Sequence, residues 1–242
     1  MITLRRARPA DTDGIAGVVK EIWGQEILPD VCQAQIEGDS SALLVAVEEA
    51  PVANAPTGRV VGFVSAFLTT DPRDRRRWEV DLLAVRRDLE GQGLGTRLVD
   101  HACQEGEAAG AFLARGLIRV ENIASRRAFE KAGFTTDGHV HRLWLWTPEP
   151  GPVPDSSPRY PALVPVDTLT YRGLWIEDLV GASTADQRAA VATARAIVAW
   201  DQRVNAGALI PTADEHLLAH DLRQQAEMHG EYCWYVTPRS CS

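Results

Sequence analysis

One stretch, Trp78–Arg97 (WEVDLLAVRRDLEGQGLGTR), constrains the fold of this chain more than any other part of its sequence. Its apolar run Leu82–Val85 predicts a buried strand, and from Thr96 onward apolar residues repeat at helical spacing. The loop EGQGLG between them is rich in glycine, which lets backbone amides crowd together. Because the first amides of a helix have no intrahelical partner and lie at the positive end of its dipole, the stretch predicts an anion-binding loop that holds a pyrophosphate.

The loop differs from two other phosphate-binding patterns. A dinucleotide-binding loop reads GxGxxG, whereas no glycine follows three residues after Gly95, and the Gly-Lys of a Walker loop is missing. Support comes instead from Gly116–Phe134 (GLIRVENIASRRAFEKAGF), further along the chain. This segment reads as a strand, Asn122 at a helix start, a short helix, a glycine stop and another strand.

Together, Glu90–Gly95 and Asn122–Phe134 resemble the two motifs of the GNAT acetyltransferase family. The acetyl-CoA loop of that family reads Q/R-x-x-G-x-G/A, and its next helix reads roughly N-x-x-A/S-x-x-x-Y-E-K-x-G-F. Order and spacing both match, and the resemblance covers about Met1–Trp146. It implies a mixed α/β fold, with a mostly antiparallel central sheet flanked by helices.

Two positions depart from the family pattern. Glu90 stands where the family has Gln or Arg, and a carboxylate near a pyrophosphate is unfavourable. Phe129 stands where many members have the tyrosine that protonates the departing CoA thiolate. Because Phe129 cannot donate a proton, the thiolate leaves unassisted or takes a proton from water, Ser125, or a tyrosine of the tail such as Tyr232 or Tyr235.

The resemblance also implies which residues contact acetyl-CoA. Family members splay the strand that contains Leu83–Val85 from the next one to admit pantetheine, and a backbone amide there would meet the oxyanion. Asn122 would contact the pantetheine arm, a role compatible with capping its own helix. The implied acetyl-CoA-binding residues are Leu83, Ala84, Val85, Glu90, Gly91, Gln92, Gly93, Leu94, Gly95, Thr96, Asn122, Ser125 and Phe129.

Glu79 and Asp81 are the candidate catalytic residues. In a strand their carboxylates leave the same face, about 7 Å apart, and charges on an otherwise apolar strand are unfavourable unless used or paired. Glu79 aligns with the general-base position of some family members, and Asp81 lies beside an acidic position of polyamine-type members. The alternative is that one of them only pairs with the arginines of the turn Asp71–Arg77, which otherwise reads as a solvated hairpin tip.

The remaining sequence predicts three regions. Residues 1–147 form the acetyl-CoA-binding domain, 148–160 a proline-rich linker, and 161–242 a smaller α/β domain. In this last region WIEDLVGA echoes WEVDLLAV, and CWYV falls where LWLW falls, so we predict a degenerate half-repeat without a CoA loop; the alternative is an unrelated α/β appendage. In the first region the predicted elements are a strand at 2–6, helices from about 11 and at 29–37, and strands at 41–48, 59–69 and 78–85.

Composition limits the function classes. The chain has 242 residues, 45% of them hydrophobic, no run long enough to cross a membrane, and a net charge of −8. These features predict a globular protein of the cytoplasm, with neither membrane nor nucleic acid as partner. Four cysteines without metal spacing predict reduced thiols, and an Ala- and Arg-rich, Lys-poor composition is typical of a high-GC bacterium.

Histidine and tryptophan patterns predict little chemistry. His216 and His220 have the i, i+4 spacing of a zinc pair on a helix, but without a third ligand no metal site is predicted. His139 and His141 read as an exposed pair. The tryptophans at positions 144, 146, 200 and 234 read as core or interface packing rather than as an aromatic box for a quaternary amine.

We therefore expect an acyl-CoA-dependent N-acyltransferase that moves acetyl from acetyl-CoA to a primary amine of a small molecule or peptide. The acceptor would bind near residues 22–40, and the tail would complete or cover that cleft. One alternative is a non-catalytic CoA-binding sensor or interaction module. Another is a different reaction, such as thioester hydrolysis or acyl transfer from a carrier protein. The sequence is compatible with a monomer or a homodimer.

Overall fold

The computed structural model describes residues 1–49, 58–153 and 160–238. Most of the connection between the predicted strands at 41–48 and 59–69, part of the proline-rich linker and Cys241 fall outside these residues. The strands are β1 Ile2–Arg6, β2 Ser41–Glu48, β3 Arg59–Thr70, β4 Arg76–Val85, β5 Leu113–Arg119, β6 Thr135–Thr136, β7 His141–Trp146, β8 Ala162–Asp167, β9 Arg172–Glu177, β10 Ala206–Pro211 and β11 Glu227–Pro238. The α-helices are α1 Thr12–Trp23, α2 Pro29–Glu37, α3 Leu94–Ala108, α4 Ile123–Lys131, α5 Thr184–Trp200 and α6 His220–Gln225.

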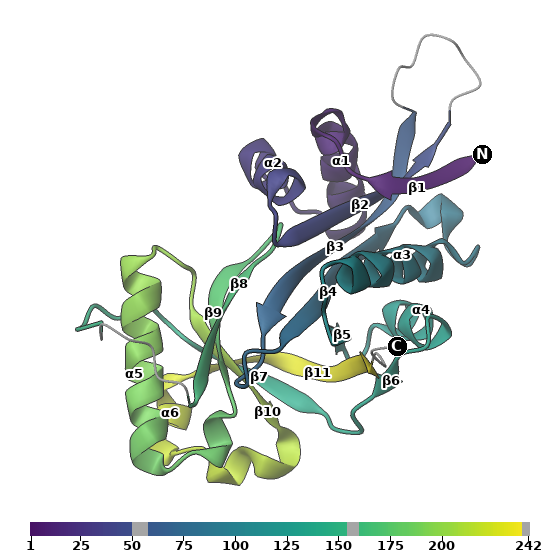
Figure 1. Ribbon diagram of the computed structural model, residues 1–242. Helices are drawn as coiled ribbons and strands as arrows, with labels where there is room; N and C mark the ends of the chain where they lie inside the picture. The colour runs from purple at the N-terminus through teal and green to yellow at the C-terminus, as the bar shows by residue number, and fades with distance from the viewer. Residues whose placement is uncertain (50–57, 154–159, 239–242) are drawn as a thin grey trace.

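All strands belong to one 11-stranded sheet, in the order β1-β2-β3-β4-β5-β11-β7-β10-β9-β8, with β6 beside β11. Only β4–β5 and β9–β10 pair in parallel; the other pairs of this sheet are antiparallel. The mixed, mostly antiparallel sheet flanked by helices confirms the predicted fold class. Figure 1 shows α1, α2, α3 and α4 around the first half of the sheet, and α5 and α6 against the second.

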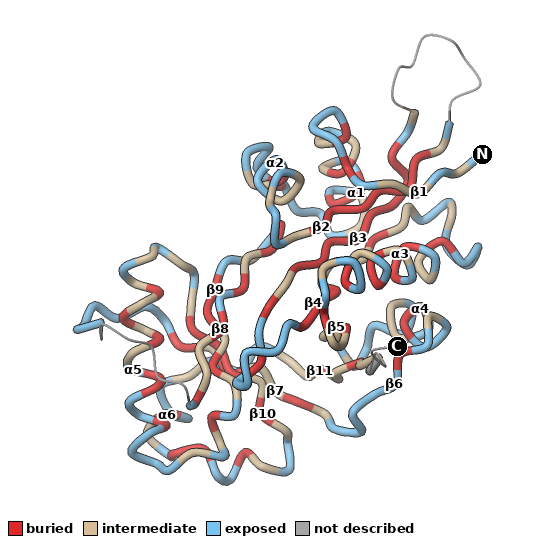
Figure 2. Tube along the Cα trace, viewed as in Figure 1, coloured by how far each residue is buried: buried red, intermediate tan, exposed pale blue. Residues whose placement is uncertain are grey.

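Apolar side chains form three clusters on this sheet. One lies beneath α3 and α4 and contains Leu98, Val80 and Phe129, and a second beneath α1 and α2 contains Ile15 and Phe63. A third packs α5 and α6 against β7, β9 and β10. In Figure 2 the buried positions follow the central strands and the inward faces of the helices, which is the amphipathic pattern that the sequence predicted.

The second region repeats part of the first in its topology. In both, a strand is followed by a helix and then by a parallel neighbouring strand: β4–α3–β5 and β9–α5–β10. The predicted half-repeat requires β9 and β10 to be neighbouring strands, as they are. The half-repeat itself stays a prediction, which this pairing supports. The segment WIEDLVGA, which echoes the strand WEVDLLAV in sequence, is a strand only as far as Glu177, because Leu179–Gly181 form a 3-10 turn.

The C-terminal strand β11 does not stay in the second half. It pairs with β5 from Tyr232↔Arg119 to Pro238↔Leu113, while β7 of the first half pairs with β10 of the second. The two halves therefore exchange their last strands, as the yellow β11 beside the teal β5 shows (Figure 1). The division into domains at residues 147 and 161 stays a prediction. Among the described residues, no helix combines the length and apolar character that a membrane span requires.

Candidate active site

Strands β4 and β5 separate in the middle of the first half. Their parallel pairing covers only Arg77↔Leu113, Trp78↔Ala114 and Glu79↔Arg115, although β4 continues to Val85. On the other side of β4, the register with β3 shifts between Ala66↔Val80 and Val64↔Leu83. Asp81 and Leu82 thus form a bulge opposite a single residue of β3.

The splay leaves backbone groups of β4 beyond Glu79 without a strand partner on the β5 side. Such groups require a partner from water or a ligand. Leu83, Ala84 and Val85 lie in this part of β4. Their predicted contact with the oxyanion and pantetheine stays a prediction, and the splay is the geometry that it requires.

The glycine loop lies at the end of the separated strand and opens to solvent. Gly91 and Gly93 adopt positive φ angles of 76° and 77°, and a Cβ atom added at either would meet nothing within 4 Å. Gly93 is the N-cap of the 15-residue helix α3, which begins at Leu94, two residues earlier than predicted. The residues from Glu90 to Gly93 are exposed, so the first amides of α3 present an accessible positive end that fits a pyrophosphate.

Two further loop residues connect this helix terminus with its surroundings. A Cβ atom at Gly95 would lie 3.6 Å from Ala128 of α4 and 3.7 Å from Leu83 of β4, so these three elements meet there. Gln92 is exposed and Thr96 half-buried. The glycine loop, the separated part of β4 and helix α4 therefore lie next to one another.

Helix α4 begins as the sequence predicted. The Asn122 Oδ1 atom accepts a hydrogen bond from the Ser125 backbone N–H at 3.1 Å, which confirms its capping role. Asn122 is exposed and Ser125 half-buried. Contacts of either residue with the pantetheine arm stay predictions, because the cap leaves the Asn122 side-chain amide group available for a ligand.

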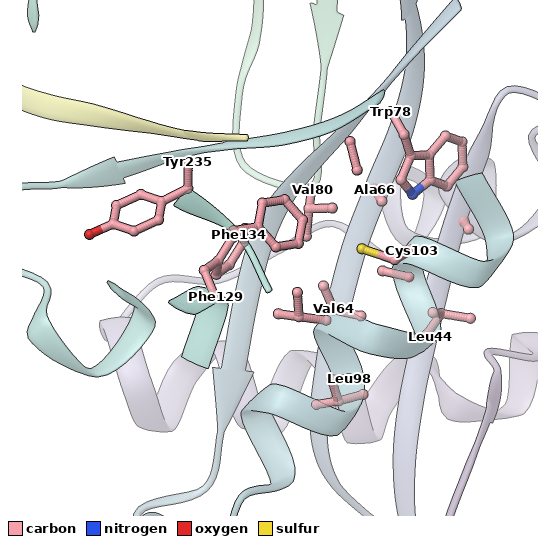
Figure 3. Packing of buried hydrophobic residues seen from close by; sticks show 14 of the residues in the cluster. Leu44, Val64, Ala66, Trp78, Val80, Leu98, Cys103, Phe129, Phe134 and Tyr235 are labelled. Carbon is pink, nitrogen blue, oxygen red and sulfur yellow. The ribbon is translucent and has the colours of Figure 1, made fainter. Parts of the chain in front are cut away.

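Phe129 forms part of the buried core beside the separated strands. It is 1% exposed, and its ring lies 4.9 Å from that of Phe134 and 6.3 Å from that of Tyr235. A Cβ atom at Gly116 would overlap the Phe129 ring, so only glycine fits there. Figure 3 shows the three rings together, with the Tyr235 hydroxyl directed away from Val80 of β4.

The tyrosines of the tail hold their hydroxyls in different settings. The Tyr235 hydroxyl accepts a hydrogen bond from Arg126 Nε at 2.9 Å and donates one to Glu130 at 3.1 Å. The Tyr232 ring lies beneath the Arg119 guanidinium, and burial raises the pKa of Tyr232. The Tyr235 hydroxyl is therefore engaged by two side chains of α4, and the Phe129 position has no hydroxyl.

Glu79 is 3% exposed and bound by other side chains on both carboxylate oxygens. Arg115 Nε donates to Oε2 at 2.8 Å and to Oε1 at 2.9 Å, and the Thr69 hydroxyl donates to Oε1 at 2.6 Å. Arg77 Nε lies 3.6 Å away. Glu79 is thus an ion-paired residue, but its main partner is Arg115 of β5 rather than an arginine of the turn. A catalytic role for Glu79 stays a prediction.

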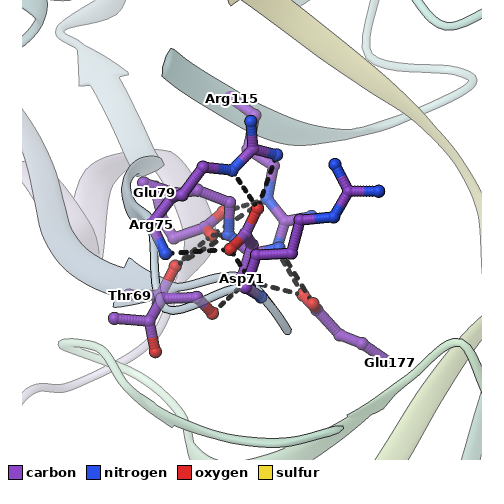
Figure 4. A network of polar contacts seen from close by, with 9 residues as sticks. Thr69, Asp71, Arg75, Glu79, Arg115 and Glu177 are labelled. Atoms are coloured by element: carbon purple, nitrogen blue, oxygen red, sulfur yellow. Dashed lines mark hydrogen bonds and ion pairs between the residues drawn. The ribbon is translucent and has the colours of Figure 1, made fainter. Parts of the chain in front are cut away.

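The same network connects the two halves (Figure 4). Glu177 of β9 accepts hydrogen bonds from Arg77 at 2.8 and 2.9 Å and from Arg115 at 2.6 Å. Burial opposes the ionisation of Glu177, but these two arginines outweigh it and lower its pKa. Within the turn predicted as a solvated tip, Arg77 is in fact 5% exposed, because it belongs to β4 and faces Glu177.

Asp81, two residues further along β4, lacks such compensation. Its Oδ2 atom is buried and has no hydrogen-bond partner. Burial raises the pKa of Asp81 to about 7, the Glu79 carboxylate adds to this, and a hydrogen bond with Thr168 opposes it. A carboxylate whose pKa lies near neutrality, on a bulge beside a splayed strand pair, is suited to accept a proton from an amine.

A cavity of about 820 Å³ lies between the α1–α2 connection, α2 and the turn from β8 to β9. Ile27, Asp30 and Gln35 line its first-half wall, and Thr168 and Tyr171 line the second. The predicted acceptor region at residues 22–40 thus forms one wall of a cavity. Sequence reasoning did not find the opposite wall, because Thr168 has no local signal that relates it to Asp81.

His216 and His220, for which no metal site was predicted, lie on different elements, since a 3-10 helix ends at Leu217 and α6 begins at His220. Two minor predictions are wrong. His141 is 7% exposed and bound to Asp137 at 2.7 Å rather than solvated. Trp200 is 79% exposed rather than packed. Within the described ranges, three or more His, Cys, Asp or Glu side chains do not gather as metal ligands would.

Comparisons with known proteins agree with this architecture. The family model described as "Acetyltransferase (GNAT) family" matches residues 11–134, more than half of the chain. A search of curated proteins finds no significant match. The fold and this match define an acetyltransferase of the mixed α/β class. The chain belongs to the GNAT acetyltransferase family.

Solved structures show the same fold at low sequence identity. NAA60 from Arabidopsis thaliana in complex with acetyl-CoA is 13% identical, with a TM-score of 0.51 over 58% of this chain and 90% of that one. Its complex with a bisubstrate analogue gives 14%, a TM-score of 0.50, and 58% and 87% coverage. The glucosamine N-acetyltransferase region of a fungal multi-domain GH3 beta-N-acetylglucosaminidase is 13% identical, with a TM-score of 0.61. That match covers 98% of this chain, which spans 38% of the fungal protein.

Proposed function

We propose that the protein is an acyl-CoA-dependent N-acyltransferase that transfers acetyl from acetyl-CoA to a primary amine of a small molecule or peptide. Family membership supports the acetyltransferase class, and the acetyl-CoA complex of NAA60 supports the cosubstrate. The observation that carries the proposal is Asp81, whose unpartnered carboxylate oxygen lies on the bulge where β4 leaves β5.

When bound, acetyl-CoA supplies an acetyl thioester to the site. The amides at the start of α3 and the Gly91–Gly93 loop hold its pyrophosphate, and unpaired backbone of β4 lies along its pantetheine arm. Asp81 removes one proton from the protonated acceptor amine, so that the neutral nitrogen attacks the thioester carbonyl carbon. A backbone N–H of Leu83–Val85 stabilises the negative charge that develops on the carbonyl oxygen.

The carbon–sulfur bond then breaks, and the nitrogen loses its second proton. That proton goes to the sulfur through water, because Phe129 offers no donor and the Tyr235 hydroxyl is bound by Arg126 and Glu130. The products are an amide, free CoA and the proton held by Asp81. Acceptors would enter through the cavity between α2 and the β8–β9 turn, where apolar walls and the exposed Asp30 suit an amine.

A non-catalytic CoA-binding sensor is the second candidate. Two observations favour it: Phe129 has no hydroxyl, and the carboxylate of Glu79, at the general-base position, is bound by Arg115 and Thr69. Both candidates use the same CoA site. On grounds of composition we also propose that the protein is bacterial and cytoplasmic, and that it binds neither nucleic acid nor membranes. We propose that it is a monomer or a homodimer.

Calorimetry with acetyl-CoA tests the ligand site. The intact protein should bind in the micromolar range, and the double variant Gly93→Glu, Gly95→Glu should lose binding, because side chains and negative charge fill the pyrophosphate site. Gly138→Glu is the matched control, since Gly138 also has a positive φ angle and open surroundings. If the intact protein does not bind acetyl-CoA, both candidates are wrong.

Release of free CoA with a panel of primary amines separates the two candidates. Loss of the proton acceptor in Asp81→Asn should lower kcat/KM by about 10²–10⁴-fold, the usual range for general-base catalysis. Asp100→Asn, on the exposed side of α3, should leave it unchanged. Acetyl-CoA binding without turnover of any amine would favour the sensor.

A further inference from the structure

Strands β9 and β10 of the second half separate toward their carboxyl ends, as β4 and β5 do in the first. Their parallel pairing ends at Gly207↔Trp175, although β9 continues to Glu177 and β10 to Pro211. A cavity of about 580 Å³ lies at this separation. It is lined by the ends of β9 and β10, by the turn from β3 to β4, and by residues of β5, β7 and β11. The carboxyl ends of parallel strands are a common place for ligands.

Helix α5, which follows β9, does not offer the anion site that α3 offers. The Ser183 hydroxyl at its N-cap accepts a hydrogen bond from the Asp186 N–H at 3.2 Å and donates one to the Asp186 carboxylate at 2.6 Å. A carboxylate therefore already lies at the positive end of the α5 dipole, whereas the first turn of α3 has no acidic residue. A second pyrophosphate is thus an unsuitable ligand for this cavity.

The three arginines that line the cavity all have carboxylate partners. Arg77 and Arg115 belong to the buried network of Figure 4, in which two glutamates balance their two charges. Arg75 lies 2.7 Å from the Asp71 carboxylate and stacks on the Phe112 ring. Because these guanidinium groups are compensated, they leave no net positive charge to attract an anion.

Two further carboxylates of the lining have no such compensation. Asp178 is exposed and follows β9 directly, and Asp214 is half-buried after β10. Within residues 1–49, 58–153 and 160–238, neither side chain forms a hydrogen bond or an ion pair. Asp178 also has a left-handed backbone with a φ angle of 59°, which is uncommon outside glycine. The cavity therefore has an excess of negative charge, which favours a cation.

A third free acceptor is provided by His141 of β7, which is 7% exposed and lines the same cavity. Its Nε2 atom lies 2.7 Å from Asp137 Oδ2, and since an ionised carboxylate only accepts hydrogen bonds, Nε2 carries the hydrogen. In the singly protonated ring Nδ1 is then an acceptor. This atom is buried and has no hydrogen-bond partner among the described residues. Because buried polar atoms are nearly always satisfied, Nδ1 indicates a place for a donor.

Aromatic side chains supply the apolar surface of the cavity. Trp175 of β9 packs edge-on against Trp234 of β11, with their ring centroids 5.8 Å apart, and Tyr160 also lines the cavity. Ligand sites commonly combine such apolar walls with a few polar groups that fix the orientation of the ligand. Here the free polar groups are all acceptors. The matching ligand has a positively charged donor at one end and an apolar body at the other.

We propose that this cavity is a second ligand site of the protein, which binds a small organic ammonium ion with an apolar body. His141 Nδ1 and the carboxylates of Asp178 and Asp214 supply the acceptors for its N–H groups. The site shares no lining residue with the cavity beside α2 and is separate from the glycine loop of α3. It does not depend on the proposed acetyl transfer.

The test is calorimetry of the full chain with phenethylamine as the probe, in the absence of acetyl-CoA. Phenethylamine should bind, and 2-phenylethanol and 3-phenylpropionate, which are neutral and anionic, should bind at least ~10-fold more weakly because they lack the charged donor. Asp178→Asn and Asp214→Asn should each weaken phenethylamine binding by ~10-fold, the size of one hydrogen bond between charged groups. The matched control is Asp13→Asn, which removes an exposed carboxylate outside both cavities and should leave the affinity unchanged.

A second readout is the imidazole ¹⁵N NMR spectrum. The His141 Nδ1 signal, assigned with His141→Gln, should shift when phenethylamine is added, because the nitrogen gains a donor. Equal affinities of phenethylamine and 2-phenylethanol, or no binding at millimolar concentrations, would overturn the inference. So would a loss of affinity in Asp30→Asn but not in Asp178→Asn or Asp214→Asn, because the probe would then occupy the cavity beside α2. Absence of acetyl transfer would refute the proposed function and leave this site intact.

Discussion

The carboxylates of Glu79 and Asp81 lie on one strand but differ in how far neighbouring side chains compensate their charge. Glu79 has Arg115, Thr69 and, more distantly, Arg77 around it, so its charge is compensated in a buried place. Asp81 receives only the Thr168 hydroxyl and feels the charge of Glu79, so burial dominates and favours the protonated acid. Divergent environments for neighbouring titratable groups are a recurrent feature of acid–base sites.

This imbalance makes Asp81 a source of instability above acidic pH. Its folded pKa of about 7 exceeds the value of about 3.9 for an unfolded aspartate, so between these values the folded protein binds a proton that the unfolded chain has lost. Stability therefore falls as the pH rises through this window. Asp81→Asn should be more stable than the wild type at pH 8, by about 2 kcal/mol, and should lose most of this gain at pH 4.5.

Urea unfolding of both proteins across this pH range measures the difference. Glu79→Gln is the informative comparison, because it leaves Arg115 and Arg77 with less compensation and should destabilise the fold. A gain for Asp81→Asn that does not depend on pH would contradict the assignment of the titrating group.

At the scale of elements, local sequence patterns were enough to predict the glycine loop and the helices beside it. The glycines of Glu90–Gly95, the Asn122 cap and the apolar spacing of α3 each act within a few residues, and α2 and β2 have the predicted bounds. The start of α3 was placed two residues late, because the left-handed Gly93 serves as its N-cap.

Long-range partners could not be predicted from such patterns. Glu177 lies 62 residues from Arg115 and 100 from Arg77, and a lone glutamate at a strand end carries no sign of either. Thr168 reaches Asp81 only because the β8–β9 turn packs on the first half. Contacts between side chains that are far apart in the sequence depend on the tertiary structure, and local sequence patterns do not reveal them.

The Glu177 network predicts that a single substitution at Glu177 strongly lowers the free energy of unfolding. Glu177→Ala would leave Arg77 and Arg115 buried with only Glu79 as counter-charge, and should cost about 3–5 kcal/mol in free energy of unfolding. Arg188→Ala, which removes an exposed pair with Asp221, should have a much smaller effect, because solvent screens that pair. Urea unfolding at one pH compares the two.

Because Arg77 and Arg115 lower the pKa of Glu177, its contribution is present above the unfolded pKa and is lost as the pH falls through the folded one. The Glu177→Ala deficit should therefore shrink under acidic conditions. Equal losses for the two variants would show that the network does not hold the halves together.

At the scale of the whole molecule, the exchange of β7 and β11 makes each half depend on the other. Strand β11 covers β5 along its length and brings Tyr235, 1% exposed, into the cluster with Phe129 and Phe134. Strand β7 in turn covers β10 and brings Trp144 and Trp146 to α5 and α6. The two cores are thus each closed by a strand from the other half.

We therefore expect that residues 1–160 alone do not form a folded acetyl-CoA-binding unit. Without β11, one side of β5 loses its strand partner and the Phe129 cluster is exposed, so the fragment should show no cooperative thermal transition and no binding of acetyl-CoA by calorimetry. Co-expression of 1–160 with 161–242 should restore both, because the exchanged strands can pair between chains as they do within one. A fragment 1–160 that unfolds cooperatively and binds acetyl-CoA would mean that the first half supplies its own closing strand, with β7 replacing β11 beside β5.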